Sequence, residues 1–361
     1  MSIERIAILG AGGFIGSHLV PGLLQRFGCE VDAVDLNFDK LECTDPRVNR
    51  IQASVNDPNL VAELTSRSRV VLSLTALCNP ALYSTVPLEV IDANFTHLLP
   101  LVGACATRGV RLIHFSTAEV YGRRALDAAG DPTSEMSEDS SCFLLGPINR
   151  ERWSYACAKQ LLERVIWAHG QRDQLPFTII RPFNTIGSRM DYVPGIDGEG
   201  TPRVLACFMG RLLRGEPLQL VDGGEQKRAF MSITDMVEAV CRVVAQPARC
   251  NGQIINLGNP RNNRSVAHLA QLMARAYAAL VPGTPEARFE HVSAADFYGP
   301  GYDDTSERIP DITKARQLLG WEPTESLAGM LPGIVLDYVQ RYGARVAAQP
   351  VELPYGAALQ A

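Results

Sequence analysis

Two side chains four residues apart are suited to one acid–base task. Tyr155 and Lys159 form the pattern YxxxK on a stretch that we predict to be helical as far as His169. A four-residue spacing places both side chains on one face of a helix. Because a nearby ammonium group lowers the pKa of a phenol, Tyr155 could act as a base toward a substrate hydroxyl group. The pattern alone is common by chance, so the rest of the chain has to support it.

A glycine-rich segment near the N-terminus has the spacing of a dinucleotide-binding loop. GxxGxxG lies between a predicted strand at 6–9 and a predicted helix at 14–27. Glycine permits a tight turn there, and it lets backbone N–H groups and the positive helix end approach a pyrophosphate. The candidate cofactor residues of this loop are Gly10, Gly13, Phe14, Ile15 and Gly16.

Asp35 ends the second predicted strand, at 31–35, and lies 19 residues after Gly16. A carboxylate at this position can accept hydrogen bonds from both ribose hydroxyl groups of adenosine. It would repel a 2′-phosphate, and no Arg follows it directly. The pattern therefore predicts NAD as the cofactor and not NADP.

The elements that must position these residues alternate along the first half of the chain. Continuous apolar runs separated by helical patterns predict a parallel sheet covered by helices on both faces. The fold class is therefore α/β, with a doubly wound, Rossmann-like sheet. Ser116 and Thr117 follow the last of these runs, at the sheet edge where such folds bind ligands. The predicted strands are 6–9, 31–35, 70–74 and 110–115.

The pattern changes after about residue 180, where Gly and Pro become dense and short strands mix with helices. We expect a first domain at 1–180, interleaved with parts of 230–260, and a smaller C-terminal lobe mainly at 181–345. Residues 346–361 have no clear period, which predicts a surface tail. The expected elements of the lobe are helices at 204–214, 233–244 and 266–280, and strands at 218–221 and 253–257.

Composition excludes several classes of protein. The chain has 361 residues, of which 46% are hydrophobic and 20% charged, and 34 Lys and Arg against 39 Asp and Glu give a net charge of −5. This balance predicts a folded protein with no affinity for nucleic acid or an anionic membrane. No apolar run reaches the ~20 residues of a membrane span, and no signal peptide is evident. Nine cysteines without a CxxC pair predict reduced thiols, a cytoplasmic location and no metal site.

The motifs, taken in order, resemble the extended short-chain dehydrogenase/reductase family. They are the glycine loop, the segment 116–122, the YxxxK pair and the segment 181–184. The resemblance implies a Rossmann domain that binds NAD and a lobe that binds a nucleotide-sugar. Further segments resemble the UDP-glucuronate decarboxylases of that family, namely the decarboxylase domain of the bifunctional polymyxin-resistance protein and UDP-xylose synthase. These segments are 146–153, 221–230, 255–260 and 298–308.

The resemblance also implies roles for individual residues. Its catalytic group is Tyr155, Lys159, Thr117, Glu119 and Arg308, with Glu119 as the catalytic glutamate and Arg308 as the general acid. It adds Ser54, Leu74, Tyr155 and Lys159 to the NAD contacts. Arg and Lys suit a diphosphate, which Arg can bind with two parallel hydrogen bonds. The implied substrate contacts are Cys78, Tyr83, Thr117, Ala118, Arg152, Asn184, Gln219, Lys227, Arg228 and Tyr302.

Four positions depart from the pattern of these relatives. Ala118 stands where most of them carry Ser, which removes one polar group near the sugar. Ser54 replaces an Asp near the adenine, Cys78 replaces an Ala, and Thr185 replaces a Trp. The changes indicate a modified pocket that retains its catalytic residues.

The implied reaction is NAD-dependent oxidation of UDP-glucuronate at C4, followed by decarboxylation to a UDP-4-keto-pentose or a UDP-pentose. A nucleotide-sugar 4-epimerase or 4,6-dehydratase remains an alternative, because these enzymes share the C4 oxidation and Ala118 is compatible with an epimerase. A non-catalytic NAD(H)-binding protein is a second alternative, although such a protein should have lost Tyr155 or Lys159. Relatives commonly form homodimers through a helix pair, and Leu161 and Trp167 provide an apolar surface for such a contact.

Overall fold

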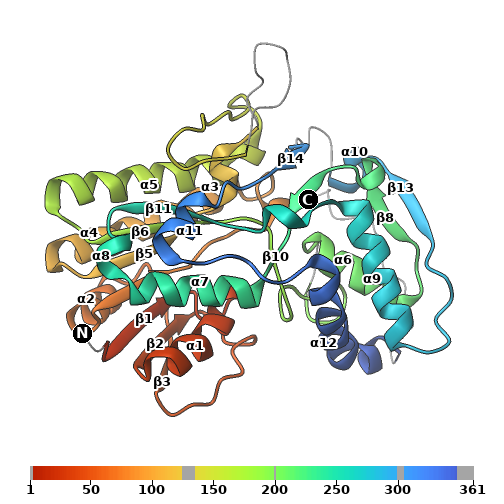
Figure 1. Cartoon of the computed structure of the whole chain (residues 1–361), viewed down its shortest axis with the longest axis horizontal. Coiled ribbons are helices and arrows are strands. Elements are labelled where there is room, and N and C mark those ends of the chain that lie inside the picture. The colour runs from red at the N-terminus through yellow and green to blue at the C-terminus, as the bar shows by residue number, and fades with distance from the viewer. Residues whose placement is uncertain (1–2, 124–134, 199–200, 299–304, 348–361) are drawn as a thin grey trace.

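The computed structural model describes residues 3–123, 135–198, 201–298 and 305–347. Seven strands of these residues form one parallel sheet in the order β11-β6-β5-β4-β1-β2-β3 (Figure 1). The order reverses direction at β1 and β4, which confirms the predicted doubly wound sheet. The strands are β1 (Arg5–Leu9), β2 (Glu30–Asp35), β3 (Val48–Gln52), β4 (Val70–Ser73), β5 (Arg111–Phe115), β6 (Phe177–Pro182) and β11 (Gln253–Leu257).

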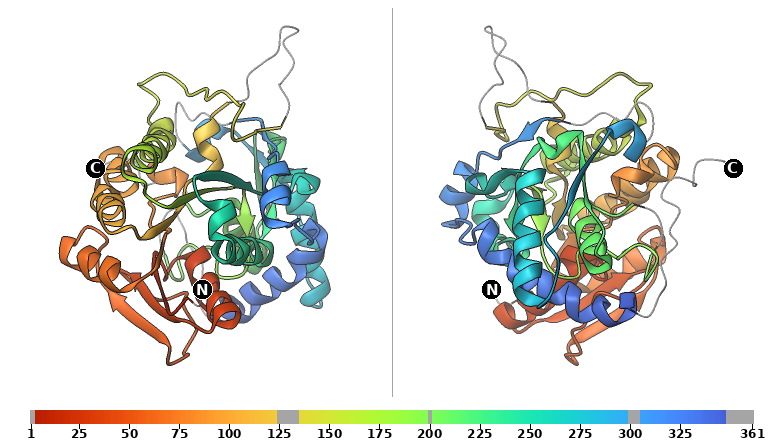
Figure 2. Two further views of the ribbon diagram at one scale, coloured as in Figure 1. Left: turned by 60° about the vertical axis from the view of Figure 1, so that its left-hand side comes forward. Right: turned by 90° about the vertical axis from the view of Figure 1, so that its right-hand side faces the viewer.

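Helices cover both faces of the sheet, and each face has its own apolar core. On one face α1 packs against α7, and on the other α2 packs against α4 and α4 against α5 (Figure 2). The inner strands are buried on both faces, which is why they appear in the sequence as unbroken apolar runs. These helices are α1 (Phe14–Phe27), α2 (Pro58–Arg67), α3 (Pro87–Asn94), α4 (Leu99–Arg108), α5 (Ser154–Asp173), α7 (Ile233–Ala245), α8 (Pro247–Cys250) and α11 (Thr313–Leu319).

A smaller lobe lies beside the carboxyl ends of the strands (Figure 1). Its helices α6, α9 and α12 pack on one another. Short strands add the parallel pairs β7–β10 and β8–β13 and the three-stranded sheet β12-β9-β14. The elements are β7 (Thr185–Ile186), α6 (Val204–Arg214), β8 (Leu218–Val221), β9 (Lys227–Ala229), β10 (Met231–Ser232), β12 (Asn263–Ser265), α9 (Val266–Leu280), β13 (Phe289–Val292), α10 (Ala294–Tyr298), β14 (Glu307–Arg308) and α12 (Leu327–Ala347).

Most predicted elements are present with bounds close to those expected, including the helices at 204–214 and 266–280. The strand at 253–257, expected among the elements of the lobe, is β11 at the edge of the large sheet. Strand β3 was not predicted, because this edge strand is largely exposed and polar and lacks an apolar run. Helix α12 continues to Ala347, and the rest of the predicted tail lies outside the described residues.

Candidate active site

The glycine loop forms a cradle that a side chain would fill. A Cβ atom on Gly10 would lie 2.9 Å from the backbone carbon of Leu74, and one on Gly16 would lie 2.1 Å from the carbonyl oxygen of Gly10. Gly10 also has a φ of +89°, which favours glycine. Gly13 is the N-cap of α1, and no side chain caps that helix end. This glycine-lined helix end fits the pyrophosphate of a dinucleotide.

Asp35 lies at the end of β2, beside the same loop. Its carboxylate accepts hydrogen bonds from the backbone N–H of Gly12 at 2.9 Å and of Leu36 at 2.7 Å. These bonds orient the carboxylate where an adenosine ribose would have to lie. Ser54 is exposed two residues after β3, and the backbone N–H of its neighbour Ala53 donates to the carbonyl oxygen of Asp35 at 3.1 Å. The glycine loop therefore fits the pyrophosphate of NAD, and the Asp35 carboxylate fits its ribose.

A pocket of about 420 Å³ lies between the glycine loop, the carboxyl ends of the strands and the lobe. It brings together most of the residues predicted from the sequence. Asp35, Ser54 and Lys227 are not part of its lining, and Tyr302 lies outside the described residues. The predicted residues in the lining are Gly10, Gly13, Phe14, Ile15, Gly16, Leu74, Cys78, Tyr83, Thr117, Ala118, Glu119, Arg152, Tyr155, Lys159, Asn184, Gln219, Arg228 and Arg308.

Tyr155 and Lys159 both project from the buried face of α5. The ring of Tyr155 stacks on that of Tyr83, with centroids 5.0 Å apart and planes 12° apart, and its hydroxyl group is hydrogen-bonded to Thr117. The Lys159 ammonium group donates to the carbonyl oxygen of Phe115 at 3.0 Å. Helix α5 and the end of β5 thus place the Tyr, Thr and Lys side chains in one corner of the pocket.

The pKa values in this corner differ from the expectation that the Lys159 ammonium group lowers the pKa of Tyr155. Burial, reinforced by the nearby Cys78 and Glu119, raises the pKa of Tyr155, and the hydrogen bond to Thr117 lowers it only in part. Burial lowers the pKa of Lys159 to about 8. The Lys159 ammonium group lies on a backbone carbonyl group and does not offset the burial of the phenol. Desolvation therefore dominates both groups in this structure.

Glu119 forms a buried cluster with two arginines. It lies in a short 3₁₀ turn, η3 (Ala118–Tyr121), that is capped by Thr117. Arg308 binds both carboxylate oxygens, one of them at 2.9 Å, and Arg152 binds Oε2 at 2.8 Å. Burial alone would raise the pKa of Glu119, but the two guanidinium groups outweigh it and lower the pKa to about 2. The carboxylate is therefore ionised at neutral pH and fixes the position of Arg308.

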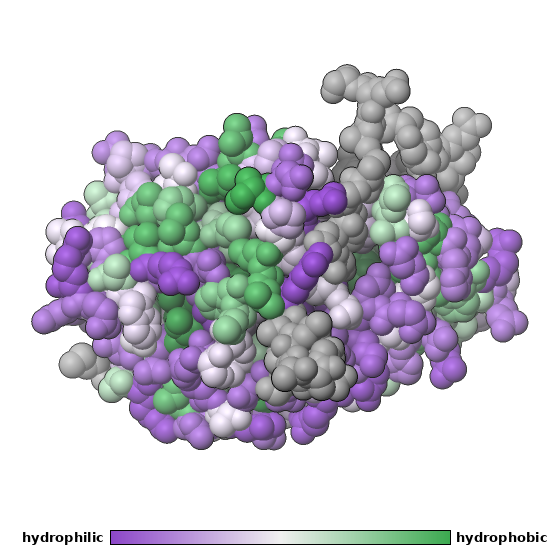
Figure 3. Space-filling view, turned by 90° about the horizontal axis from the view of Figure 1, so that it is seen from above, coloured by the Kyte–Doolittle hydropathy of each residue, from purple (hydrophilic) through white to green (hydrophobic). Residues whose placement is uncertain are grey.

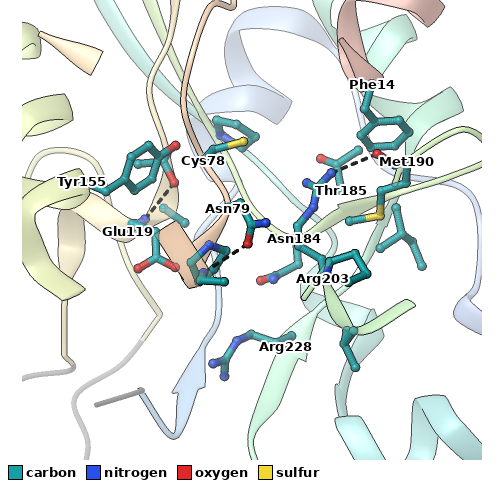
Figure 4. Close-up of a pocket in the computed structure, with 18 of the residues that line it drawn as sticks. Phe14, Cys78, Asn79, Glu119, Tyr155, Asn184, Thr185, Met190, Arg203 and Arg228 are labelled. Carbon is teal, nitrogen blue, oxygen red and sulfur yellow. Dashed lines mark hydrogen bonds between the residues drawn. The ribbon is translucent and has the colours of Figure 1, made fainter. Parts of the chain in front are cut away.

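Other polar side chains line the pocket from the lobe. Figure 4 shows Tyr155, Cys78 and Glu119 on one side, Phe14 and Met190 on the other, and Asn184 and Arg228 toward the lobe. Arg228 is buried and donates to the carbonyl oxygens of Lys227 at 2.8 Å and Thr305 at 2.9 Å.

Lys227, by contrast, projects out of β9 toward Glu307, with its side chain 56% exposed. Neighbouring residues of a strand point to opposite faces, so only one of Lys227 and Arg228 can enter the pocket.

The sequence analysis missed Arg203, which the structure places in the pocket beside the glycine loop. Asp191 accepts hydrogen bonds from its Nε and Nη2 at 2.9 and 3.0 Å, and the guanidinium carbon lies 5.9 Å from the ring centroid of Phe14. The pair keeps a cation in the pocket. Arg203 follows a stretch dense in Gly and Pro and lies far from Phe14 in sequence, so no local pattern singles it out.

Comparison with known proteins identifies the family. The model of the NAD dependent epimerase/dehydratase family matches residues 6–258. This chain belongs to that family. It is 45% identical over 348 residues to a UDP-D-apiose/UDP-D-xylose synthase of Oryza sativa subsp. japonica, which covers 90% of this chain and 87% of the relative. It is 44% identical over 355 residues to UDP-D-apiose/UDP-D-xylose synthase 1 of Arabidopsis thaliana, which covers 93% of this chain and 91% of the relative.

A solved structure agrees with this placement. The crystal structure of the PbgP3 protein from Burkholderia pseudomallei has a TM-score of 0.81 and 35% identity, and the match covers 96% of this chain and 99% of that one. The chain is thus an NAD-dependent enzyme with the predicted Rossmann fold, and the family resemblance is confirmed. Within the described residues, no helix has the length and apolar character to cross a membrane.

Proposed function

We propose that this enzyme oxidises UDP-glucuronate at C4, removes its carboxylate and returns the ketone to the level of a UDP-pentose. The observation that carries the proposal is the pairing of Arg308 with Glu119 in the same pocket as Tyr155. A second acid–base group beside the oxidising one suits a reaction with two chemical steps. The names of the relatives, which are UDP-D-apiose/UDP-D-xylose synthases, support a pentose product.

The C4 step depends on Tyr155. As a phenolate, Tyr155 removes the proton of the C4 hydroxyl group, and Thr117 holds the phenol oxygen in place. Held by the glycine loop and Asp35, NAD would supply the hydride acceptor for C4 and the hydride donor for the later reduction. Lys159 holds the end of β5, next to Thr117, through its hydrogen bond to the carbonyl oxygen of Phe115.

Decarboxylation follows from the position of the new ketone. A 4-ketone is β to the C6 carboxylate, so the C5–C6 bond can break and its electron pair can pass into the ketone as an enolate. Protonated Tyr155 and Thr117 donate to the enolate oxygen, and CO₂ leaves. A proton then returns to C5. Arg308 delivers it, directly or through water, while the Glu119 carboxylate holds the guanidinium group in position.

The nucleotide is held by the polar side chains of the lobe. Arg228 offers a buried guanidinium group and Asn184 and Gln219 offer amides in the pocket lining. Arg152 lies with its guanidinium carbon 5.8 Å from the ring centroid of Tyr83, next to the Glu119 cluster. We assign Arg228 to the diphosphate because a guanidinium group can bind it with parallel hydrogen bonds. Arg152 we assign to the sugar.

The pentose of the product could be xylose or apiose. Apiose and xylose are isomeric pentoses, and both require that the hydride return to a carbonyl group. For xylose this group is the 4-ketone, whereas for the branched apiose it is the aldehyde that forms when a carbon–carbon bond breaks and re-forms. In either case the enzyme consumes no net NAD.

Purified protein with UDP-glucuronate and NAD⁺ tests this proposal. Product analysis by NMR and the absorbance of NADH give the result, with UDP-glucose and UDP-galactose as control substrates. We expect a UDP-pentose, CO₂ and no net NADH. A stoichiometric yield of NADH with a UDP-4-keto-pentose would show that the hydride is not returned. Retention of the carboxylate, with inversion at C4, would establish the epimerase alternative.

The described structure supports proposals for domains, assembly and location as well. The sheet of 1–180 receives β11, which supports an NAD-binding domain interleaved with 230–260 and a nucleotide-sugar-binding lobe at 181–345. Leu88 of α3 and Leu161 and Trp167 of α5 are 71%, 47% and 44% exposed, and Figure 3 shows hydrophobic side chains gathered on this side. We propose a homodimer through this face, which light scattering would test.

All nine cysteines are free thiols, which supports a cytoplasmic location. Fractionation of cells that produce the protein would test it.

A further inference from the structure

A chain of buried hydrogen bonds runs behind the pocket. Arg181 of β6 binds the carboxylate of Glu163 with two bonds of 3.0 and 2.6 Å, and its Nη1 donates to the hydroxyl group of Tyr121 at 2.8 Å. The Tyr121 hydroxyl group donates in turn to Oδ1 of Asn256 in β11 at 2.9 Å. Tyr121 and Arg181 are 1% exposed and Asn256 is fully buried. Bonds this deeply buried are ordered, because water cannot replace them.

Asn256 joins this chain to the segment that carries Arg308. Its Nδ2 donates to the carbonyl oxygens of Met136 at 2.9 Å and Asp311 at 3.2 Å. The backbones of these segments also bind each other, from Met136 N–H to Ile309 O at 2.8 Å and from Asp311 N–H to Met136 O at 2.9 Å. Asn256 therefore clamps the residues that directly follow Arg308. Strand β14 has two residues, so hydrogen bonds to the residues that follow it help to fix the position of the Arg308 side chain.

The other end of this chain of hydrogen bonds lies near Tyr155, Thr117 and Lys159, which together form the oxidation corner of the pocket. Its coupling to that corner is weaker than its coupling to Arg308. Glu163 follows Lys159 by one helical turn on the buried face of α5. The Glu163–Arg181 pair has two bonds of its own and persists without Tyr121. Tyr121, by contrast, shares the η3 turn with Glu119 and is the link between that turn and Asn256.

We propose that Tyr121 and Asn256 are positioning residues that hold Arg308 against Glu119, so that losing either slows the protonation of C5 more than C4 oxidation. The inference rests on the proposed function. The hydroxyl group of Tyr121 orients the Asn256 amide, and the amide fixes the Arg308 segment through Met136 and Asp311. Neither side chain lines the pocket, so both act through Arg308.

Single-turnover kinetics of Tyr121→Phe test the proposal. The substrate is UDP-glucuronate in D₂O, the NADH signal reports C4 oxidation, and deuterium at C5 of the UDP-pentose reports protonation of C5. We expect oxidation within about threefold of wild type and protonation of C5 about ten- to hundredfold slower, because misplacement of a catalytic group by about 1 Å has that size of effect. The matched control is Tyr277→Phe, which removes the same hydroxyl group from a buried tyrosine of α9 outside the pocket and leaves both rates unchanged.

A second variant keeps the test decisive if Tyr121→Phe does not fold. Asn256→Asp retains the acceptor for Tyr121 and replaces the donor to Met136 and Asp311, and we expect the same selective slowing of C5 protonation. Equal slowing of both steps, or no change in either, would overturn the inference. A wild-type enzyme that releases no CO₂ from UDP-glucuronate would instead refute the proposed function, and the two failures are thus distinguishable.

Discussion

The two halves of the candidate active site are built in opposite ways. The oxidation corner has Tyr155 and Lys159 on one helix, with Thr117 from the adjacent strand end, and burial sets its pKa values. The Glu119–Arg308 pair joins segments 189 residues apart, and the charges of neighbouring arginines set the pKa of Glu119. A helix fixes the first group by local geometry, whereas the second depends on how distant segments pack. We therefore expect the two halves to respond differently to mutation and to pH.

The largest effect should come from Tyr155→Phe. Removing the phenolic base should lower kcat about a thousandfold, within the range known for general bases, while the affinity for NAD stays nearly unchanged. Steady-state turnover and titration calorimetry with NAD⁺ measure the two quantities. Loss of NAD binding together with turnover would show that Tyr155 holds the cofactor and would contradict its role as the base.

Arg308→Met should sharpen the contrast between the halves. We expect turnover to UDP-pentose to fall about a hundredfold, since one positioned acid contributes about that much. C4 oxidation, read from the NADH signal in a single turnover, should survive because Tyr155 and Thr117 are untouched. If oxidation and product formation fall together, the division of labour between the two halves is wrong.

Glu119→Gln should separate stability from catalysis. The change removes the negative charge that the buried Arg152 and Arg308 guanidinium groups both bind, at a cost of about 3 kcal/mol in the free energy of unfolding. Denaturant titration at neutral pH measures it. The folded pKa of about 2 lies below the ordinary value of 4.5, so the contribution is full above pH 4.5 and declines as the pH falls toward 2. A difference between wild type and variant that does not shrink in acid would contradict this.

The pH dependence of the oxidation corner should follow Lys159. Because burial lowers its pKa to about 8, the ammonium group is lost as the pH rises through 8, and kcat should decline on that alkaline side. Lys159→Arg keeps its charge at all these pH values, so its profile should lack the alkaline decline even if its rate is lower. An alkaline decline that persists in Lys159→Arg would assign it to another group.

The smallest effect should come from Lys227→Ala. The sequence resemblance placed Lys227 among the substrate contacts, but its side chain points away from the pocket. We expect KM for UDP-glucuronate to rise less than about threefold, because exposed ion pairs are weak. The neighbouring Arg228→Ala, which empties a buried position in the pocket, should raise KM by at least tenfold more. Equal effects would place Lys227 on the substrate.

Local patterns in the sequence were enough to predict the oxidation corner. The glycine loop, Asp35 and the Tyr155–Lys159 pair each sit on one element or on consecutive ones, and periodicity places such elements well. The partners of Glu119 were not derivable in this way, because nothing in the sequence brings Arg308 of β14 to the η3 turn. The family resemblance implied a catalytic role for Glu119 and for Arg308, but not their pairing.

The same limit applies to Arg203 and to Lys227. Arg203 meets the Phe14 loop through tertiary packing, and the choice between Lys227 and Arg228 depends on the register of a three-residue strand. Strand β3 escaped prediction for a different reason, since exposed edge strands lack the apolar run that marks the inner ones.

The central claim is that CO₂ leaves from C6 and that a proton then returns to C5. The most direct test runs the reaction with UDP-glucuronate in D₂O and examines the product by NMR. We predict a UDP-pentose with a single deuterium on C5, in one stereochemical position, and slower incorporation in Arg308→Met. A product that retains its carboxylate and carries no deuterium at C5 would contradict the account.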